Sequence, residues 1–324
     1  MNAANIIGIG TDNVLLVRTN ARGEMLASEL VKTLEECEAR DLQPFAIVAT
    51  LGNTISGGFD PIKEIAEIAY ARNIWLHVDA AYGGMLALTS KREQLFSGIE
   101  YANSVVWDAH KSLRVPLACS VLLFKDVEIL KRTFSSKAEY LFRSESTDWM
   151  SDDLGSYTLL CGKKFEALKL WLIWKAFGTR YFRGLAEDRL HMVDSVNRLL
   201  LENEEFIPAH TALSPTVCFR YLPRDLSELE EREFTDYLND LHTWVREEAK
   251  RRGHAFFNIV PIAGVQHFRV IFVNELCGSE DFREILDIIA KLASEFQKNN
   301  PYPKNDLLAD KGRDQKADIH LSVI

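Results

Sequence analysis

The residues best suited to chemistry lie in the stretch SVVWDAHKSL, residues 104–113. Its first four residues are rich in β-branched and aromatic side chains, which predicts a buried strand that ends at a polar corner. Lys111 lies just past that end, where ligands bind in open α/β sheets. A lysine held there, partly out of water, can lose its proton and form a Schiff base. The alternative is a solvated loop lysine, as most lysines are.

A carboxylate has the same relation to an earlier strand. Residues 74–78 predict a strand, Asp79 follows it, and two glycines break the chain at 83–84. Asp79 and Lys111 should therefore face one crevice. Pyridoxal phosphate (PLP) enzymes pair an acid with the cofactor's pyridine nitrogen and a lysine with its aldehyde. Ala81 is small enough for a flat ring to lie against the backbone. The alternative role for Asp79 is a helix or turn cap.

The elements that must hold these residues alternate between strand and helix. Asp60 can cap a helix and Pro61 suits its first turn. Short links between alternating strands and helices are typical of βαβ units, so this half predicts an α/β domain with a mostly parallel sheet. The predicted strands cover residues 14–17, 45–50, 74–78 and 104–107, and the predicted helices cover 24–40 and the stretch after Pro61.

The second half of the chain predicts a different unit. Residues 143–156 are rich in Asp and Ser, which indicates a mobile loop of the kind that covers active sites. We expect a PLP-binding large domain over 1–180, a small C-terminal α+β domain with its bridging helix over 181–300, and a polar tail over 301–324. The predicted helices cover 163–177, 185–201, 227–251 and 279–297, and the predicted strands cover 216–221, 255–260 and 267–273.

Composition excludes several classes of protein. The 324 residues carry a net charge of −9 with no block of Lys or Arg, which argues against binding nucleic acid or an anionic membrane. The first residues lack a basic stretch and a long apolar run, so we expect no signal peptide, and the longest apolar cluster, 170–177, is too short to span a bilayer. The five cysteines are scattered and have no metal-ligand spacing. We therefore predict a cytoplasmic protein with reduced cysteines and no metal.

Several segments, in their order and spacing, resemble the PLP-dependent amino acid decarboxylases of the aromatic, glutamate and cysteine-sulfinate group. The resemblance covers about residues 3–297. It implies an aspartate-aminotransferase-like large domain, a small C-terminal domain and a homodimer with its active site at the subunit interface. The matching segments are HVDAAYGG at 77–84, WDAHKSLRVPLACS at 107–120, GIGTDN at 8–13, TLGNT and FD within 50–60, LCGKK and LWLIWK within 160–175, and TVCF at 216–219.

The resemblance implies PLP as the cofactor and a role for each matching residue. Lys111 would form the Schiff base, with His110 beside it near the phosphate. Asp79 would pair with the pyridine nitrogen, and Ala81 would pack on the ring. Two further residues would lie near the phosphate or the ring edge: Thr54 and Asp108.

Arg269 matches an arginine that holds a substrate carboxylate in the glutamate branch of the group. It shares a predicted strand face with Ile271 and Val273, so its guanidinium needs an anion there, and a carboxylate fits its fork. The alternative is a structural ion pair with a nearby Asp or Glu.

The implied function is release of CO2 from a small acidic or diamino L-amino acid, which leaves the amine. An aldehyde synthase is one alternative, because the group's proton-returning loop tyrosine is missing: Asp148 or Trp149 lies near its position, and Tyr157 lies late. Members of the group also carry a longer N-terminal portion with a stacking His. We expect that portion to be absent, so the other alternative is an inactive remnant that only binds a partner. Either way, we expect exposed apolar surface and poor solubility.

Overall fold

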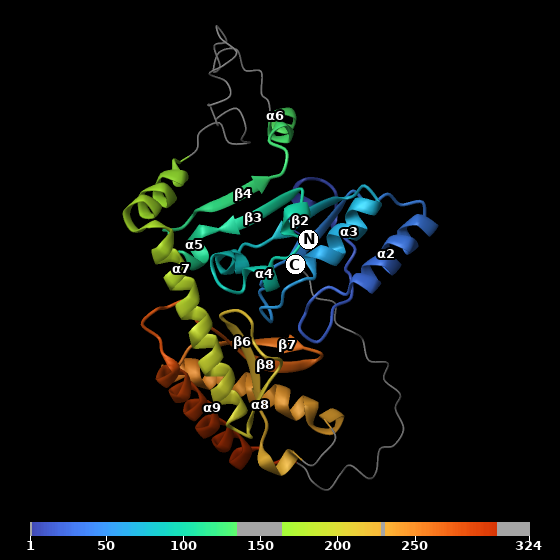
Figure 1. The fold of residues 1–324 in the computed structure, drawn as a ribbon. Helices are drawn as coiled ribbons and strands as arrows, with labels where there is room; N and C mark the ends of the chain where they lie inside the picture. Colours follow the sequence, from blue (N-terminus) through green and yellow to red (C-terminus); the bar gives the residue numbers. More distant parts are fainter. Residues whose placement is uncertain (1, 135–163, 228–230, 303–324) are drawn as a thin grey trace.

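The computed structural model describes residues 2–134, 164–227 and 231–302. The strands of these ranges form two four-stranded sheets, with the orders β1-β2-β3-β4 and β5-β6-β8-β7. The first sheet lies in the upper half of Figure 1 and the second in the lower half. The loop predicted at 143–156 and the tail beyond residue 302 lie outside the described residues.

The first sheet has three parallel strands and one antiparallel edge strand. β1 (Ala46–Thr50), β2 (Trp75–Asp79) and β3 (Ser104–Asp108) run parallel, and β4 (Ser120–Phe124) returns antiparallel to β3. The predicted α/β class with a mostly parallel sheet is confirmed. The parallel arrangement brings the carboxyl ends of β1, β2 and β3 to one edge.

Helices cover one face of this sheet. α3 (Ile62–Ala71) buries its apolar side chains at i, i+3, i+4 and i+7, the spacing of one helix face. α2 (Ala27–Ala39) packs beside α3. The strand residues turned toward these helices form the core: Ile47, Ala49, Leu76 and Val78.

The opposite face of the sheet is only partly covered by the described residues. Successive strand residues point to opposite faces, and directly paired residues share a face. Val48 on β1 is paired with His77 on β2, and Leu122 on β4 is paired with Val106 on β3. Val48 is 43% exposed and Leu122 is 50% exposed. The apolar side chains of this face therefore meet solvent in the described structure.

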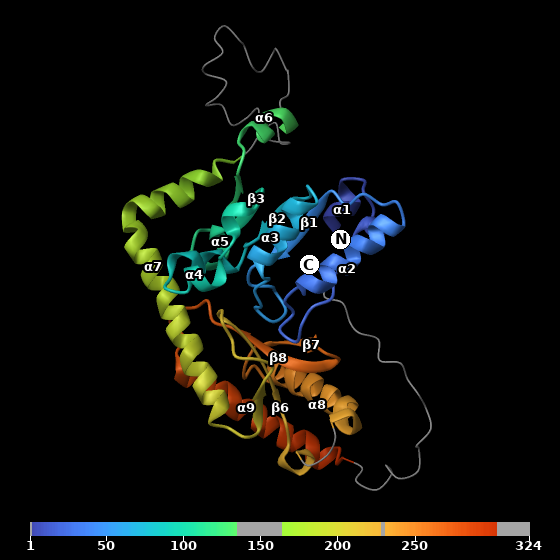
Figure 2. The same ribbon diagram turned by 45° about the vertical axis from the view of Figure 1, so that its right-hand side comes forward.

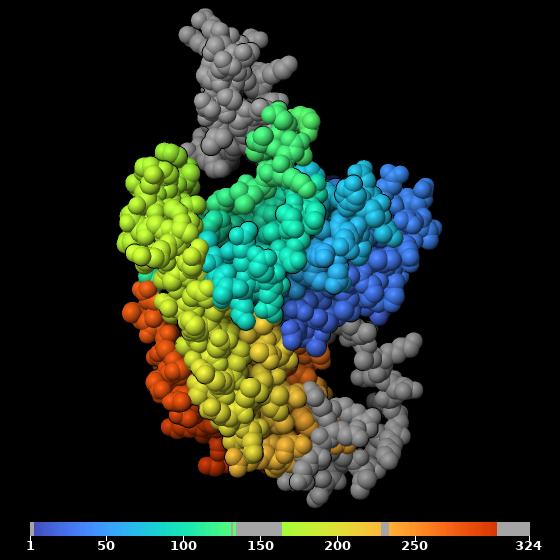
Figure 3. Space-filling model, viewed as in Figure 1, coloured from blue at the N-terminus to red at the C-terminus, as the bar shows by residue number. Residues whose placement is uncertain are grey.

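One long helix links the two sheets. α7 (Glu166–Leu201) replaces the two predicted helices, which it joins across a bend at Gly178. Gly178 has φ 73°, a conformation that suits glycine. Trp174 contacts Trp107 of β3 edge-on and stacks on Phe182, which is fully buried. Figure 3 shows the surface of α7, in yellow-green, running beside both units.

The second sheet is antiparallel throughout, and two helices cover one of its faces (Figure 2). Its strands are β5 (Phe206–Pro208), β6 (Thr216–Tyr221), β7 (Asn258–Ile262) and β8 (Val265–Ile271). α8 (Glu231–Arg251) and α9 (Ser279–Asn299) form the helical layer. Phe219, Phe268 and Phe282 are fully buried between sheet and helices. Burying each such ring contributes roughly 2–3 kcal/mol.

Two local predictions are wrong, and one three-residue strand was not predicted. Residues 14–17 form no strand, and the pairing there is a single bridge between Thr19 and Met25. The short strand β5 was not predicted, because three residues give no periodicity to detect. Asp60 does not cap α3; its carboxylate accepts hydrogen bonds from the backbone nitrogens of Met25 (2.6 Å) and Thr50 (2.7 Å). Asp60 is buried there, and the two hydrogen bonds supply the partners that a buried carboxylate needs.

The remaining helical elements are short. Among the described residues, no helix combines the length and apolar character needed to cross a membrane. The short α-helices are α1 (Asn2–Ile6), α4 (Arg92–Leu95), α5 (Ala109–Ser112) and α6 (Glu128–Phe134). The 3-10 turns are η1 (Thr11–Asn13), η2 (Gly83–Leu88), η3 (Ile99–Tyr101) and η6 (Arg224–Leu226).

Candidate active site

Lys111 lies on α5, the single helical turn that follows β3. Its Nζ is 3.0 Å from Oδ2 of Asp108, the last residue of β3, and its side chain is 42% exposed. The strand end fixes the carboxylate, and the following turn brings the amine back over it. The structure therefore places an amine at the carboxyl end of a strand, in contact with an acid.

Asp108 is 9% exposed. Burial by itself would raise the pKa of this carboxyl group, but a hydrogen bond from the Ser120 hydroxyl and the hydrogen bond and charge of Lys111 outweigh it. The pKa of Asp108 is therefore held below its ordinary value. The carboxylate stays charged at neutral pH and holds the Lys111 amine in place.

His110 is oriented by the backbone at the start of β4. Its Nδ1 lies 3.1 Å from the backbone nitrogen of Cys119 and 3.0 Å from its carbonyl oxygen. Its Nε2 lies 3.9 Å from Oδ2 of Asp108. Asp108 thus contacts the lysine and faces the imidazole, so the structure brings these three predicted residues together.

Asp79 ends the neighbouring strand β2, on the same sheet face as Asp108. Its partner in the ladder is Val106, two residues before Asp108. Oδ1 of Asp79 accepts a hydrogen bond of 3.0 Å from the backbone nitrogen of Ala81, which is 9% exposed. Within the described ranges, no cation forms an ion pair with Asp79. Its second oxygen is therefore open to a donor, such as the protonated nitrogen of a flat ring.

Thr54 lies in the loop after β1, where it is exposed. Its carbonyl oxygen accepts a hydrogen bond from Nη1 of Arg269 on β8. Nε of Arg269 is buried without a hydrogen-bond partner, and no ion pair of Arg269 is found among the described residues. The structural ion pair that was the alternative for this residue is thus not seen, and its guanidinium keeps capacity for an anion.

The loop that carries Thr54 is clamped by the second unit. The thiol of Cys218 on β6 lies 3.2 Å from the carbonyl oxygen of Ile55, and the Ser214 hydroxyl donates to the carbonyl oxygen of Gly57 at 3.2 Å. Burial raises the pKa of the Cys218 thiol to about 12, so the thiol keeps its proton. These contacts position Thr54 and Arg269 against each other.

Two neighbours of the site gained no role from the sequence. Ser120 donates a hydrogen bond to Asp108. In the sequence, the one indication of this residue was its place at the end of a segment that resembles the family. Tyr82 lies close enough to Arg269 to feel its charge, although burial dominates and raises the pKa of its hydroxyl to about 12. Both depend on partners that are distant in the chain, which explains why the sequence did not indicate them.

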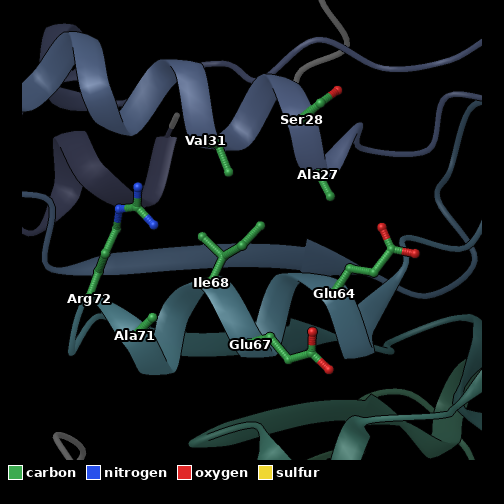
Figure 4. A pocket seen from close by; sticks show the side chains of 8 residues that line it. All are labelled: Ala27, Ser28, Val31, Glu64, Glu67, Ile68, Ala71 and Arg72. Carbon is green, nitrogen blue, oxygen red and sulfur yellow. The ribbon is translucent and has the colours of Figure 1, made fainter.

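A surface hollow lies away from these residues, between α2 and α3 (Figure 4). Ile68 and Val31 face each other across it, and Glu64 and Arg72 stand toward its two ends. None of the predicted site residues lines this hollow. The strand ends, and not the hollow, therefore remain the candidate site.

Comparison with known proteins gives consistent matches. The family described as "Pyridoxal-dependent decarboxylase conserved domain" matches residues 1–222. The human protein "Acidic amino acid decarboxylase GADL1" is 36% identical over 307 residues, which are 91% of this chain and 57% of that protein. This chain therefore spans little more than half the length of that relative.

Solved structures match as well. The crystal structure of mouse CSAD has a TM-score of 0.80 and 30% identity, and the match covers 90% of this chain and 61% of that chain. The glutamate decarboxylase domain of a diaminobutyrate-pyruvate transaminase and L-2,4-diaminobutyrate decarboxylase from Vibrio parahaemolyticus has a TM-score of 0.73 and 28% identity; the match covers 91% and 56%.

Proposed function

Because the chain belongs to the pyridoxal-dependent decarboxylase family, we propose that it removes CO2 from an L-amino acid with PLP bound at Lys111. One observation carries the proposal. The amine of Lys111 and the open carboxylate oxygen of Asp79 lie at the carboxyl ends of adjacent parallel strands, on one face of the sheet. An amine and an acid in this relation suit the aldehyde and the pyridine nitrogen of the family's cofactor.

The residues of this edge fit PLP. Asp79 has one oxygen held by the backbone and one open to accept from a pyridinium, and Ala81 has a side chain small enough for a flat ring to pack on. We propose that Lys111 bonds covalently to the cofactor's aldehyde, and that His110 and Asp108 lie on its phosphate side. Thr54 would border the ring or the phosphate from the loop after β1.

When bound, PLP supplies an electron sink for the pair of electrons left at Cα. The chain's own residues prepare this. Asp79 would keep the proton on the ring nitrogen, since a negatively charged carboxylate favours the protonated form of a neighbouring base. Asp108 holds the Lys111 ammonium in place, and the ammonium proton must pass to a base before the amine can react. His110, fixed by the Cys119 backbone, faces the same carboxylate and can take or return a proton there.

Arg269 supports an acidic substrate. Its Nη1 is bonded to the Thr54 carbonyl oxygen, while its buried Nε has no partner. We propose that it binds the second acidic group of the substrate, which is retained in the product: a carboxylate in a small glutamate-like amino acid, or a sulfinate in a sulfinoalanine-like one. The name of the human relative, an acidic amino acid decarboxylase, agrees with this choice, and the Vibrio protein keeps a diamino substrate as the second candidate.

The proposal is tested on the purified chain with added PLP. We expect visible absorbance from a lysine-bound cofactor, together with release of CO2 from an acidic amino acid. Lys111→Ala should lose both. Lys250→Ala, a change of an exposed lysine at the end of α8, should keep both.

Each contrary result has a defined meaning. If the unmodified chain shows no such absorbance, or if Lys111→Ala retains it, the cofactor is not bound at Lys111 and the proposal fails. Release of ammonia with consumption of O2 would indicate an aldehyde synthase instead. A chain that binds the cofactor without turnover of any amino acid would support the non-catalytic alternative.

A further inference from the structure

A chain of hydrogen bonds lies on the partly open face of the first sheet, the face that also carries Asp79. Nε1 of Trp75 donates to the Ser104 hydroxyl at 2.9 Å, and the same hydroxyl lies 2.7 Å from Nδ1 of His77. Ser104 is 4% exposed and is the ladder partner of His77. The three side chains thus form one connected unit across β2 and β3.

The chemistry of the donors gives this unit a direction. An indole N–H can only donate, so Ser104 accepts that bond and has its own proton left to give. Among the described residues, the acceptor found for that proton is Nδ1 of His77, and a hydroxyl as deeply buried as Ser104 needs such a partner. Nδ1 of His77 is therefore unprotonated, and the proton of the neutral ring lies on Nε2.

His77 and Asp79 are two residues apart on β2, so their side chains lie on the same face. Burial lowers the pKa of His77 below its ordinary value of 6.5, and the negative charge of Asp79 opposes part of that shift. The flanking strands bring Val48 from β1 and Val106 from β3, which carry no charge. Among the described residues of β1 to β4, the other charged side chain on this face is that of Asp108, at the end of β3 and paired with Lys111.

We propose that His77 is a positioning residue for the cofactor site: held neutral by Trp75 and Ser104, it leaves the charge of Asp79 for the ring nitrogen. The inference rests on the proposed function, because it assumes that role for Asp79. A protonated His77 would instead draw on the same carboxylate and compete with the cofactor. Cofactor binding therefore weakens in acid through His77.

The coupling works in both directions. When a protonated ring nitrogen neutralises Asp79, His77 loses the anion that favours its charged form, so its pKa falls. By linkage, protonated His77 binds the cofactor more weakly by the same factor. A fall of half a pKa unit corresponds to about a threefold loss of affinity.

The first test follows His77 directly by NMR in the full chain with labelled histidine, without any activity measurement. His77→Gln assigns the signal. We expect the pKa of His77 to be lower in Asp79→Asn than in the unmodified chain, and to fall by about half a unit when PLP is added to the unmodified chain. The exposed His254 provides a matched control: at each pH its signal should be the same in the unmodified chain, in Asp79→Asn and after PLP is added.

A pKa of His77 that is the same in the unmodified chain and in Asp79→Asn would overturn the inference. If Asp79→Asn does not fold, as judged by circular dichroism, the comparison with and without PLP decides, since it needs no substitution. If the unmodified chain binds no PLP at any pH, the proposed function fails, while the Asp79→Asn comparison still decides whether the two side chains are coupled.

The second test measures PLP affinity against pH in the unmodified chain and in His77→Gln. The affinity of the unmodified chain divided by that of His77→Gln should fall about threefold as the pH drops through the pKa of His77. Only the unmodified chain gains the competing positive charge. His254→Gln should follow the unmodified chain throughout. A ratio that does not depend on pH would contradict the role of His77, since a purely structural role would shift affinity equally at every pH.

Discussion

The chemistry of single residues at the strand ends depends on which partner each one already has. Within the part of the chain that the structure describes, Asp108 is occupied by Lys111 and Ser120, whereas Asp79 accepts a hydrogen bond from a backbone nitrogen and Nε of Arg269 has no hydrogen-bond partner. Groups with unfilled hydrogen-bonding capacity are the ones that can receive a ligand without first losing a bond. This difference, more than residue type, is why we propose Asp108 as an acid that positions Lys111, and Asp79 and Arg269 as binding groups.

Arg269→Lys tests the binding group that faces Thr54. Lysine keeps the positive charge but loses the planar fork. We expect KM for an acidic amino acid to rise about tenfold with kcat changed much less, because one charge-assisted hydrogen bond to bound substrate is lost. Steady-state kinetics measure both constants. Arg283→Lys, on the exposed surface of α9, should leave them unchanged, and equal kinetics in both variants would remove Arg269 from the substrate site.

At the scale of elements, the loop after β1 depends on a glycine. Gly57 has φ 75°, and an added Cβ would lie 2.4 Å from the Ser214 hydroxyl oxygen. We expect Gly57→Ala to destabilise the chain by about 1–3 kcal/mol, from backbone strain and lost contact. Urea unfolding measures this. Gly184→Ala is the control: in α7, its Cβ meets nothing within 4 Å, so stability should stay equal or rise.

α8 is held to the second sheet by a buried histidine. Nδ1 of His242 lies 2.7 Å from the Gln266 carbonyl oxygen, and Nε2 lies 2.9 Å from the carbonyl oxygen and 3.3 Å from the backbone nitrogen of Tyr221. Burial lowers the pKa of His242 from 6.5 to about 4. The folded chain therefore keeps the ring neutral where the unfolded chain is already protonated.

The sign of the pH effect follows. Stability from neutral His242 is complete above pH 6.5, declines as the pH falls below that value, and is lost by about pH 4. We expect the free energy of unfolding to decrease by up to about 3 kcal/mol across this range. Urea titrations at several pH values measure it. His254→Gln, an exposed change, should keep the decrease, whereas a decrease that persists unreduced in His242→Gln would assign it to other groups.

At the scale of the whole molecule, the first sheet leaves apolar side chains of one face in solvent. Val48 and Leu122 lie on opposite edge strands of that face, and each is more than two-fifths exposed, at 43% and 50%. Edge strands with exposed apolar residues favour association with other chains. The predicted poor solubility and the proposed homodimer both concern surfaces of this kind, and both stay predictions.

Leu122→Ser should reduce binding of a hydrophobic dye and concentration-dependent association of the chain, because it removes an apolar side chain from the open face. Light scattering and dye fluorescence measure the two effects. Leu276→Ser provides the control, since Leu276 is 84% exposed in a loop of the second unit. If both substitutions have the same effect, the open face is not the source of association.

The sequence by itself determined most of the strands and helices, the place of Asp79 and Lys111 at strand ends, and the family. Apolar periodicity and local motifs carry that information: β6 spans the predicted residues 216–221, and Asp79 and Lys111 lie at strand ends as expected. The boundaries proposed at residues 180 and 300 stay predictions. The first of them falls inside α7, two residues after its bend.

Only the tertiary structure decided which groups are partnered. Asp60 was expected to cap a helix and instead ties Met25 to Thr50, and Arg269 reaches the loop at Thr54 across more than two hundred residues. The unit of Trp75, Ser104 and His77 likewise depends on the register of β2 against β3. A side chain's hydrogen-bond partner depends on burial and on contacts distant in sequence, and neither is encoded in local spacing.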